Sequence, residues 1–183
     1  MNKTWLFNPF RYIAGLTSLT IGWAIMLATA GIAWFGKAHF DGVVDMHSGL
    51  ITPFSWYLLD QLTAWSCAVL VFYLAGLIFS ASAVRFVDVA GTMALARWPL
   101  IFAALLNLLT TPITDPHNIP ATAIIIYLLE ALFFIWMVAL MYRAFCVSTN
   151  LKGSKATVVF VAALLTAEAL SKAAFYFLYR HIH

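Results

Sequence analysis

The chain has 183 residues, of which 64% are hydrophobic and only 9% charged, with a net charge of +3. An ordinary soluble domain carries about 25% charged residues, so this chain has too few to cover its own surface in water. Length and composition together predict one helical membrane domain over residues 1–183. They argue against a nucleic-acid partner, because the positive charges are sparse and fall mostly on one side of the predicted membrane.

Five apolar segments follow one another along the chain, separated by short polar connections. They cover residues 12–35, 62–82, 94–111, 121–145 and 156–179. About 20 apolar residues are needed to cross the hydrocarbon core as a helix. The third segment is the shortest, and it carries Arg97 and Pro99 near its start. The predicted fold class is therefore an all-α, five-helix transmembrane bundle with a short third span.

The positions of lysine and arginine predict the orientation of this bundle. With five spans and the N-terminus inside, seven of these residues fall on the inner face and two on the outer face, while Lys172 lies within the fifth span. Cytoplasmic loops carry such an excess of positive charge. If the third segment instead re-entered on one side, the bias would largely vanish. We therefore expect an N-in, C-out orientation.

The longest polar connection, residues 37–60, contains two histidines and two aspartates within nine positions. Imidazole and carboxylate groups suit zinc and other divalent metal ions, and a second outer loop could complete such a site. The candidate ligands are His39, Asp41, Asp45 and His47, with Asp115 and His117 in the second loop. The alternative is that these side chains cap turns and hold the loop backbone, as aspartate often does.

A second group of candidates lies within the predicted spans. Glu130 and Glu168 each lie about 12 residues from the inner end of their helices, so neighbouring antiparallel helices would bring them to similar depth. Lys172 follows Glu168 by four residues and Tyr127 precedes Glu130 by three, so each pair shares a helix face. Ionisable groups in a span often mark an ion or ligand path. The alternative is a structural pair of Glu168 with Lys172, with Glu130 protonated and hydrogen-bonded between helices.

The connection before the third span supplies a further candidate site. Arg85 and Arg97 are expected on the inner face, where they could bind lipid phosphates or simply anchor the chain at the interface. Asp88 follows Arg85 by three residues and could pair with it across one helical turn. No established catalytic or phosphate-binding motif is visible in the sequence.

Three stretches resemble the Yip1 family of small integral membrane proteins. These are residues 7–13 (FNPFRYI), 39–47 (HFDGVVDMH) and 91–99 (GTMALARWP). The first two resemble bacterial members, and the third resembles the loop between the second and third spans. The resemblance implies five spans with the N-terminus inside, and a multi-pass protein of a bacterial inner membrane. The chain lacks the long N-terminal region that carries the trafficking partners of eukaryotic members, so that partner does not carry over.

Three functions remain open from the sequence. The first is a non-enzymatic Yip1-like protein that acts in membrane organisation, or in trafficking-like binding of other membrane proteins or of further copies of itself. The second is a small transporter or channel that uses the charged groups within the spans. The third is a metal-dependent membrane enzyme at the outer histidines and aspartates.

Overall fold

The computed structural model of the protein describes residues 6–49, 52–110 and 120–182. Within these ranges the chain is almost entirely helical. The helices are η1 (Pro9–Arg11), α2 (Gly15–Gly36), α3 (Phe54–Phe79), α4 (Phe86–Ala96), α5 (Leu100–Asn107), α6 (Ala121–Thr149) and α7 (Gly153–Ile182). With α4 and α5 taken together, five helical segments are long and apolar enough to cross a membrane. The prediction of an all-helical chain with five candidate spans is therefore confirmed.

Two of these segments begin earlier than the sequence predicts. The second begins at Phe54 rather than at residue 62, directly after Pro53, so that Asp60 lies inside α3 instead of at its start. The third begins at Phe86 rather than at residue 94, and Asp88 lies in its first turn. A carboxylate at that place is favoured by the helix dipole. Charged residues that hydropathy alone assigns to turns therefore belong to helices.

The third segment is the most enclosed of the five. Within the protein, 72% of the residues in its most apolar stretch are buried, against 22–33% in the other four segments. It divides into α4 and α5 at Pro99, which has no amide hydrogen and so cannot continue the helical ladder. Helix α2 packs closely on α4, and glycines allow this approach. A methyl group on Gly22 would lie only 2.6 Å from Ala94, and one on Gly91 only 2.5 Å from the Gly15 carbonyl oxygen.

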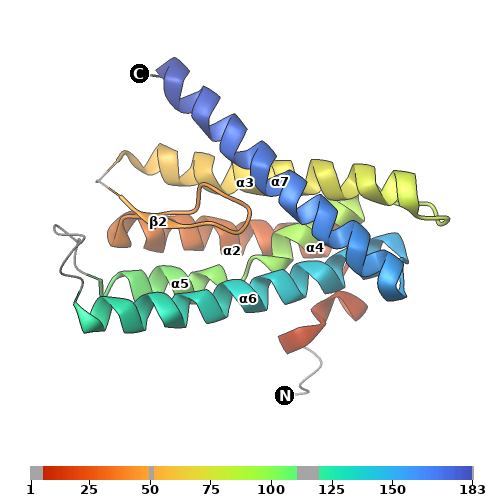
Figure 1. Cartoon of the computed structure of the whole chain (residues 1–183), viewed down its shortest axis with the longest axis horizontal. Coiled ribbons are helices and arrows are strands. Elements are labelled where there is room, and N and C mark those ends of the chain that lie inside the picture. The colour runs from red at the N-terminus through yellow and green to blue at the C-terminus, as the bar shows by residue number, and fades with distance from the viewer. Residues whose placement is uncertain (1–5, 50–51, 111–119, 183) are drawn as a thin grey trace.

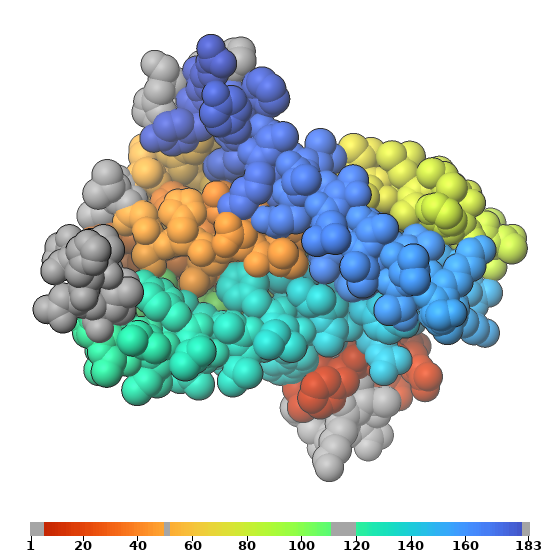
Figure 2. Space-filling model, in the orientation of Figure 1, coloured from red at the N-terminus to blue at the C-terminus, as the bar shows by residue number. Residues whose placement is uncertain are grey.

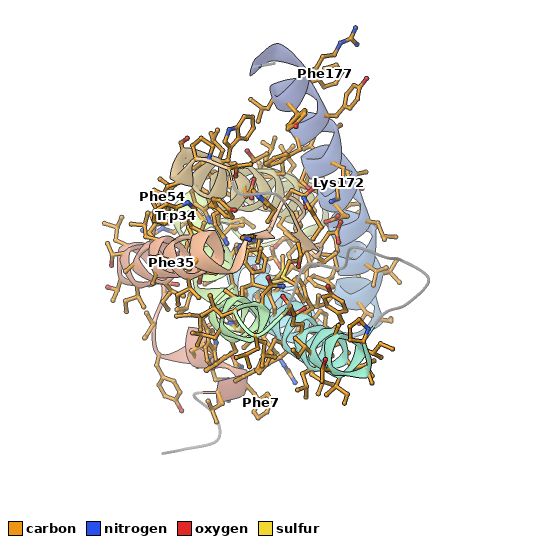
Figure 3. The ribbon with its side chains drawn as sticks, turned by 90° about the vertical axis from the view of Figure 1, so that its left-hand side faces the viewer. Phe7, Trp34, Phe35, Phe54, Lys172 and Phe177 are labelled. Carbon is orange, nitrogen blue, oxygen red and sulfur yellow. The ribbon has the colours of Figure 1, made fainter. Side chains whose placement is uncertain are left out.

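Helix α7 does not lie alongside α6, although the two are joined by a short connection. It packs mainly against α3 and touches α6 much less. In Figure 1, α7 crosses the bundle obliquely and its C-terminal end projects beyond the other helices. Lys172 lies partway along α7, and Phe177 lies nearer that projecting end (Figure 3). The expectation that the fourth and fifth spans are close antiparallel neighbours is therefore wrong.

The space that opens between α6 and α7 is filled by the connection after α2. Lys37 ends α2 in a left-handed conformation with φ 58°, which turns the chain back on itself. Strands β1 (Ala38–His39) and β2 (His47–Ser48) then pair antiparallel. The loop that joins them folds back along the helices and reaches the surface between α6 and α7 (Figures 1 and 2). We call residues 38–48 the inserted hairpin.

The inserted hairpin is anchored by apolar side chains at its tip. Phe40 is 1% exposed and Val43 is fully buried. Backbone that is neither helix nor closed barrel is tolerated at membrane depth only where protein or a water-filled cavity surrounds it. The sequence predicts a polar connection here, and the structure packs its apolar residues Phe40 and Val43 into the bundle, whereas the side chains of Asp45 and His47 remain about half exposed.

Candidate functional site

Helix α7 holds the inserted hairpin through charged groups. The Lys172 ammonium lies 3.0 Å from Asp41 Oδ2 and 2.5 Å from Asp45 Oδ2. One turn earlier, Glu168 Oε2 accepts a hydrogen bond of 2.9 Å from the Val44 amide. The expected pair between Glu168 and Lys172 does not form, because each of them binds the hairpin instead. The outer candidates Asp41 and Asp45 thus meet the span candidates Glu168 and Lys172. We call this cluster, together with the polar residues around the hairpin, the hairpin centre; those residues are His39, His47, Asp60, Gln61, Arg97, Asn107 and Glu130.

The fit between the hairpin and α7 leaves no room at Gly42. A methyl group there would lie 2.5 Å from Glu168 Oε1 and 2.8 Å from the Asp45 β-carbon. Real β-carbons essentially never approach other heavy atoms this closely. A side chain at this position would therefore displace Glu168, Asp45 or the hairpin backbone.

Arg97 lies on the opposite side of the hairpin tip, in the middle of the third span. It is 2% exposed, and its guanidinium donates to Gln61 Oε1 at 3.3 Å and to the Val43 carbonyl oxygen at 3.4 Å. The predicted position at the inner interface, with a role in lipid phosphate binding, is wrong for Arg97 because its side chain is enclosed by protein.

Arg85, the other predicted phosphate ligand, is an exposed side chain at the start of α4. Its Nε lies 3.8 Å from Asp88 Oδ2, in the expected pairing across one turn. Both residues line a shallow pocket with Gly15 at the start of α2. The Arg85 side chain therefore remains accessible at the surface.

Glu130 faces the hairpin from α6. It is 2% exposed, and its Oε1 accepts a hydrogen bond of 3.4 Å from Asn107, whose amide also donates to Ser48 at 3.0 Å. Among the described residues, Glu130 Oε2 has no hydrogen-bond partner. Glu130 and Tyr127 line one wall of a groove of about 570 Å³, and the hairpin forms the other wall.

The two histidines at the base of the hairpin each bind a carboxylate. His39 Nδ1 lies 2.8 Å from Asp60 Oδ2, a pair that is almost fully buried. His47 Nδ1 lies 3.2 Å from Asp41 Oδ1 and is half exposed. The His39 ring is stacked between those of His47 and Tyr57, with centroids 5.3 and 4.3 Å away.

This stacked arrangement does not present the histidines to a common metal ion. Rings that lie face to face direct their nitrogens sideways, and one nitrogen of each ring already contacts an aspartate. Within residues 6–49, 52–110 and 120–182, no group of three or more His, Cys, Asp or Glu side chains could hold a metal ion. Asp115 and His117, the other two predicted ligands, lie outside the described residues.

The pair formed by His47 and Asp41 shifts both of their pKa values. Partial burial by itself raises the pKa of Asp41, but hydrogen bonds from His47 and Lys172 outweigh it and lower the pKa from 3.8 to about 2. The hydrogen bond to Asp41 raises the pKa of His47 above 6.5, against the smaller effect of burial. Both shifts favour the ionised pair at mildly acidic pH.

Several members of the centre were not selected from the sequence. Asp60, Gln61 and Asn107 are not among the candidates that the sequence predicts. All three are buried and hydrogen-bonded to hairpin groups or to Arg97. The available signal was a polar residue within an apolar stretch, since such residues usually face the interior of a bundle.

Comparison with known proteins adds no further information on this site. No family model, curated protein or solved structure matches the chain.

Proposed function

We propose that this chain is a non-enzymatic multi-pass membrane protein, Yip1-like in type, whose functional element is the hairpin centre. Two of the stretches that carry the resemblance form the inserted hairpin and the close contact between α2 and α4, which supports the proposal. Residues 39–47 form most of the inserted hairpin, and residues 91–99 begin with the glycine that packs against α2. The N-in, C-out orientation and a bacterial inner membrane are part of this proposal.

Within that class, we propose that the hairpin centre binds protons or a small cation and lets them pass. The observation that carries this proposal is the junction of Lys172 with Asp41 and Asp45, beside Glu168, at the tip of an inserted segment. Ionisable groups are costly inside a membrane and frequently serve ion or proton pathways. Here they are gathered from the hairpin and from the middle of a helix.

The sign of the charge favours a cation over an anion. The centre contains five carboxylates and two permanently charged cations, with two histidines that can add charge on protonation. The carboxylates are Asp41, Asp45, Asp60, Glu130 and Glu168, and the cations are Arg97 and Lys172. An excess of negative charge in a site of low dielectric constant attracts protons and cations.

The hairpin tip itself would control such passage. Phe40 and Val43 flank Asp41 in the chain and are buried, so a cation that reaches Asp41 would proceed further only if the tip shifts. The hydrogen bond from the Val44 amide to Glu168 Oε2 holds the tip in place.

The test is ion movement by the purified full-length protein in liposomes. A trapped pH-sensitive dye would report proton flux, and ion-selective dyes would report sodium and potassium flux. We expect flux above that of protein-free liposomes, abolished by Glu168→Gln and retained in Asp88→Asn. The second variant is a matched control, because Asp88 is a carboxylate of a helix start outside the hairpin centre. Wild-type protein that moves none of these ions would refute the proposal.

Membrane organisation through protein partners is the second candidate, and one surface favours it. Helix α6 exposes an apolar stripe at helical spacing, formed by Ile124, Leu128, Leu132 and Ile135. This stripe suits lipid, a membrane partner or another copy of the chain. A photo-crosslinking amino acid at Leu128 should give a discrete protein adduct in intact membranes if partners bind there. Lipid adducts alone would exclude partner binding through this stripe.

A further inference from the structure

A pocket opens at the end of the bundle where α3 begins and α7 ends. It has a volume of about 670 Å³, which lies in the range of about 300–1,000 Å³ typical of small-molecule sites. Its walls are aromatic, and its floor is formed by polar groups of the hairpin base and α3. The four aromatic wall residues are Trp56 of α3 and Phe175, Tyr176 and Tyr179 of α7.

The sequence brings these aromatic residues to one side by helical spacing. Lys172, Phe175, Tyr176 and Tyr179 recur at intervals of three and four residues, so they share one face of α7. Trp56 precedes Asp60 by four residues on α3, so the wall and the floor of the pocket come from the same face of that helix. The Trp56 and Tyr179 rings lie 5.8 Å apart between centroids.

The floor of the pocket holds a carboxylate oxygen that lacks a donor. Asp60 is 1% exposed, and its Oδ2 binds His39. Among the described residues, its Oδ1 has no hydrogen-bond partner. A buried carboxylate oxygen without a partner carries a desolvation penalty, and a positive charge nearby would offset it. Asp41 adds a second carboxylate to the same floor.

We propose that this pocket binds an organic ammonium group. Aromatic faces attract cations through the quadrupole of the ring, and alkylated ammonium ions are bound by aromatic cages in this way. The Asp60 carboxylate supplies the compensating charge at the floor. Lys172 also lines the pocket, but its charge is taken up by Asp41 and Asp45. The inference rests on the proposed cation-binding function and names the class of cation.

Two sources present the same ammonium chemistry to this pocket. One is a free organic cation, and the other is the headgroup of a choline or ethanolamine lipid. The aromatic residues suit both, because Trp and Tyr are frequent at the membrane–water interface. The two sources differ in whether the bilayer itself competes for the pocket, which an experiment can measure.

The test uses the full chain, purified in a detergent without an ammonium group. Tetramethylammonium chloride is titrated by calorimetry, with sodium chloride at equal ionic strength as the reference. We expect specific binding, weakened by about tenfold or more in Trp56→Leu and in Asp60→Asn. Trp34→Leu is the matched control, since Trp34 lies on α2 near the same end of the bundle but does not line the pocket. Its affinity should equal that of the wild type.

Two results would overturn the inference. One is binding of tetramethylammonium no stronger than that of sodium, and the other is unchanged affinity in Trp56→Leu. The leucine variant keeps apolar bulk and leaves the buried pair of Asp60 with His39 intact, so it decides the matter even if Asp60→Asn fails to fold.

Nanodiscs separate the two sources. Phosphatidylcholine discs should abolish tetramethylammonium binding if a lipid headgroup occupies the pocket, whereas phosphatidylglycerol discs should preserve it. Equal binding in both discs identifies a free organic cation. Glu168 does not line this pocket, so Glu168→Gln should stop ion flux and leave tetramethylammonium binding intact. Flux without tetramethylammonium binding would overturn only the present inference, and binding without flux would overturn only the transport proposal.

Discussion

Replacement of Gly42 by alanine tests whether the hairpin is truly inserted against α7. The added methyl group would meet Glu168 Oε1 at 2.5 Å and the Asp45 β-carbon at 2.8 Å. Either Glu168 moves and loses its hydrogen bond to Val44, or the hairpin tip shifts out of place. A hydrogen bond to a charged group contributes about 1.5–3 kcal/mol, and overpacking costs about 1–3 kcal/mol. We therefore expect Gly42→Ala to destabilise the protein by about 1–3 kcal/mol.

The assay is reversible unfolding in SDS, followed by circular dichroism of the purified protein. Gly31→Ala is the matched control, because nothing lies within 4 Å of a methyl group at Gly31, and alanine favours a helix over glycine. In a Glu168→Ala background the methyl group gains room, so Gly42→Ala should cost much less there. If Gly42→Ala costs no more than Gly31→Ala, or the same with and without Glu168, the hairpin does not pack as described.

Three further predictions address pH, the buried arginine and orientation. The ionised pair of His47 and Asp41 should stabilise the protein fully between about pH 3.8 and pH 6.5. This contribution is lost as the pH rises through the raised pKa of His47, and also as it falls toward the lowered pKa of Asp41. Wild-type protein should therefore lose stability as the pH rises above about 6.5 in SDS titrations, and His47→Gln should lack that loss. Arg97→Met should destabilise the protein by about 1–3 kcal/mol in the same assay, because the buried Gln61 Oε1 and the Val43 carbonyl oxygen lose their donor, and unchanged stability would contradict this role. A cysteine at Lys152, with the native cysteines replaced, should resist an impermeant thiol reagent added to intact cells and react after lysis; labelling of intact cells would reverse the proposed orientation.

Recognition of the candidate residues from sequence was more successful than their placement. The outer histidines and aspartates and the charged groups within the spans were selected as two separate sites. The structure joins them, because Lys172 binds Asp41 and Asp45 across the hairpin. Sequence spacing of four residues between Glu168 and Lys172 suggested a local pair, but each finds a partner on another element. Local periodicity describes which residues share a face and does not identify what that face contacts.

The break in the third span shows a second limit of local reasoning. Arg97 beside Pro99 is typical of a helix start at the interface, where a long side chain can reach water. In the structure the same residues lie at the junction of α4 and α5, enclosed by the bundle. Partners on α3 and on the hairpin satisfy the guanidinium there. The sequence contained these partners without any indication that they would meet.

The sequence by itself determined that the chain is all-helical and that it has five candidate spans. These follow from composition and hydropathy, because in lipid each apolar segment must satisfy its own backbone hydrogen bonds, and a helix does so locally. Only the tertiary structure decided that residues 38–48 turn back into the bundle. That outcome depends on contacts between distant parts of the chain, such as Asp41 with Lys172, 131 residues apart. A polar loop is stable inside the bundle only when such partners compensate its charges.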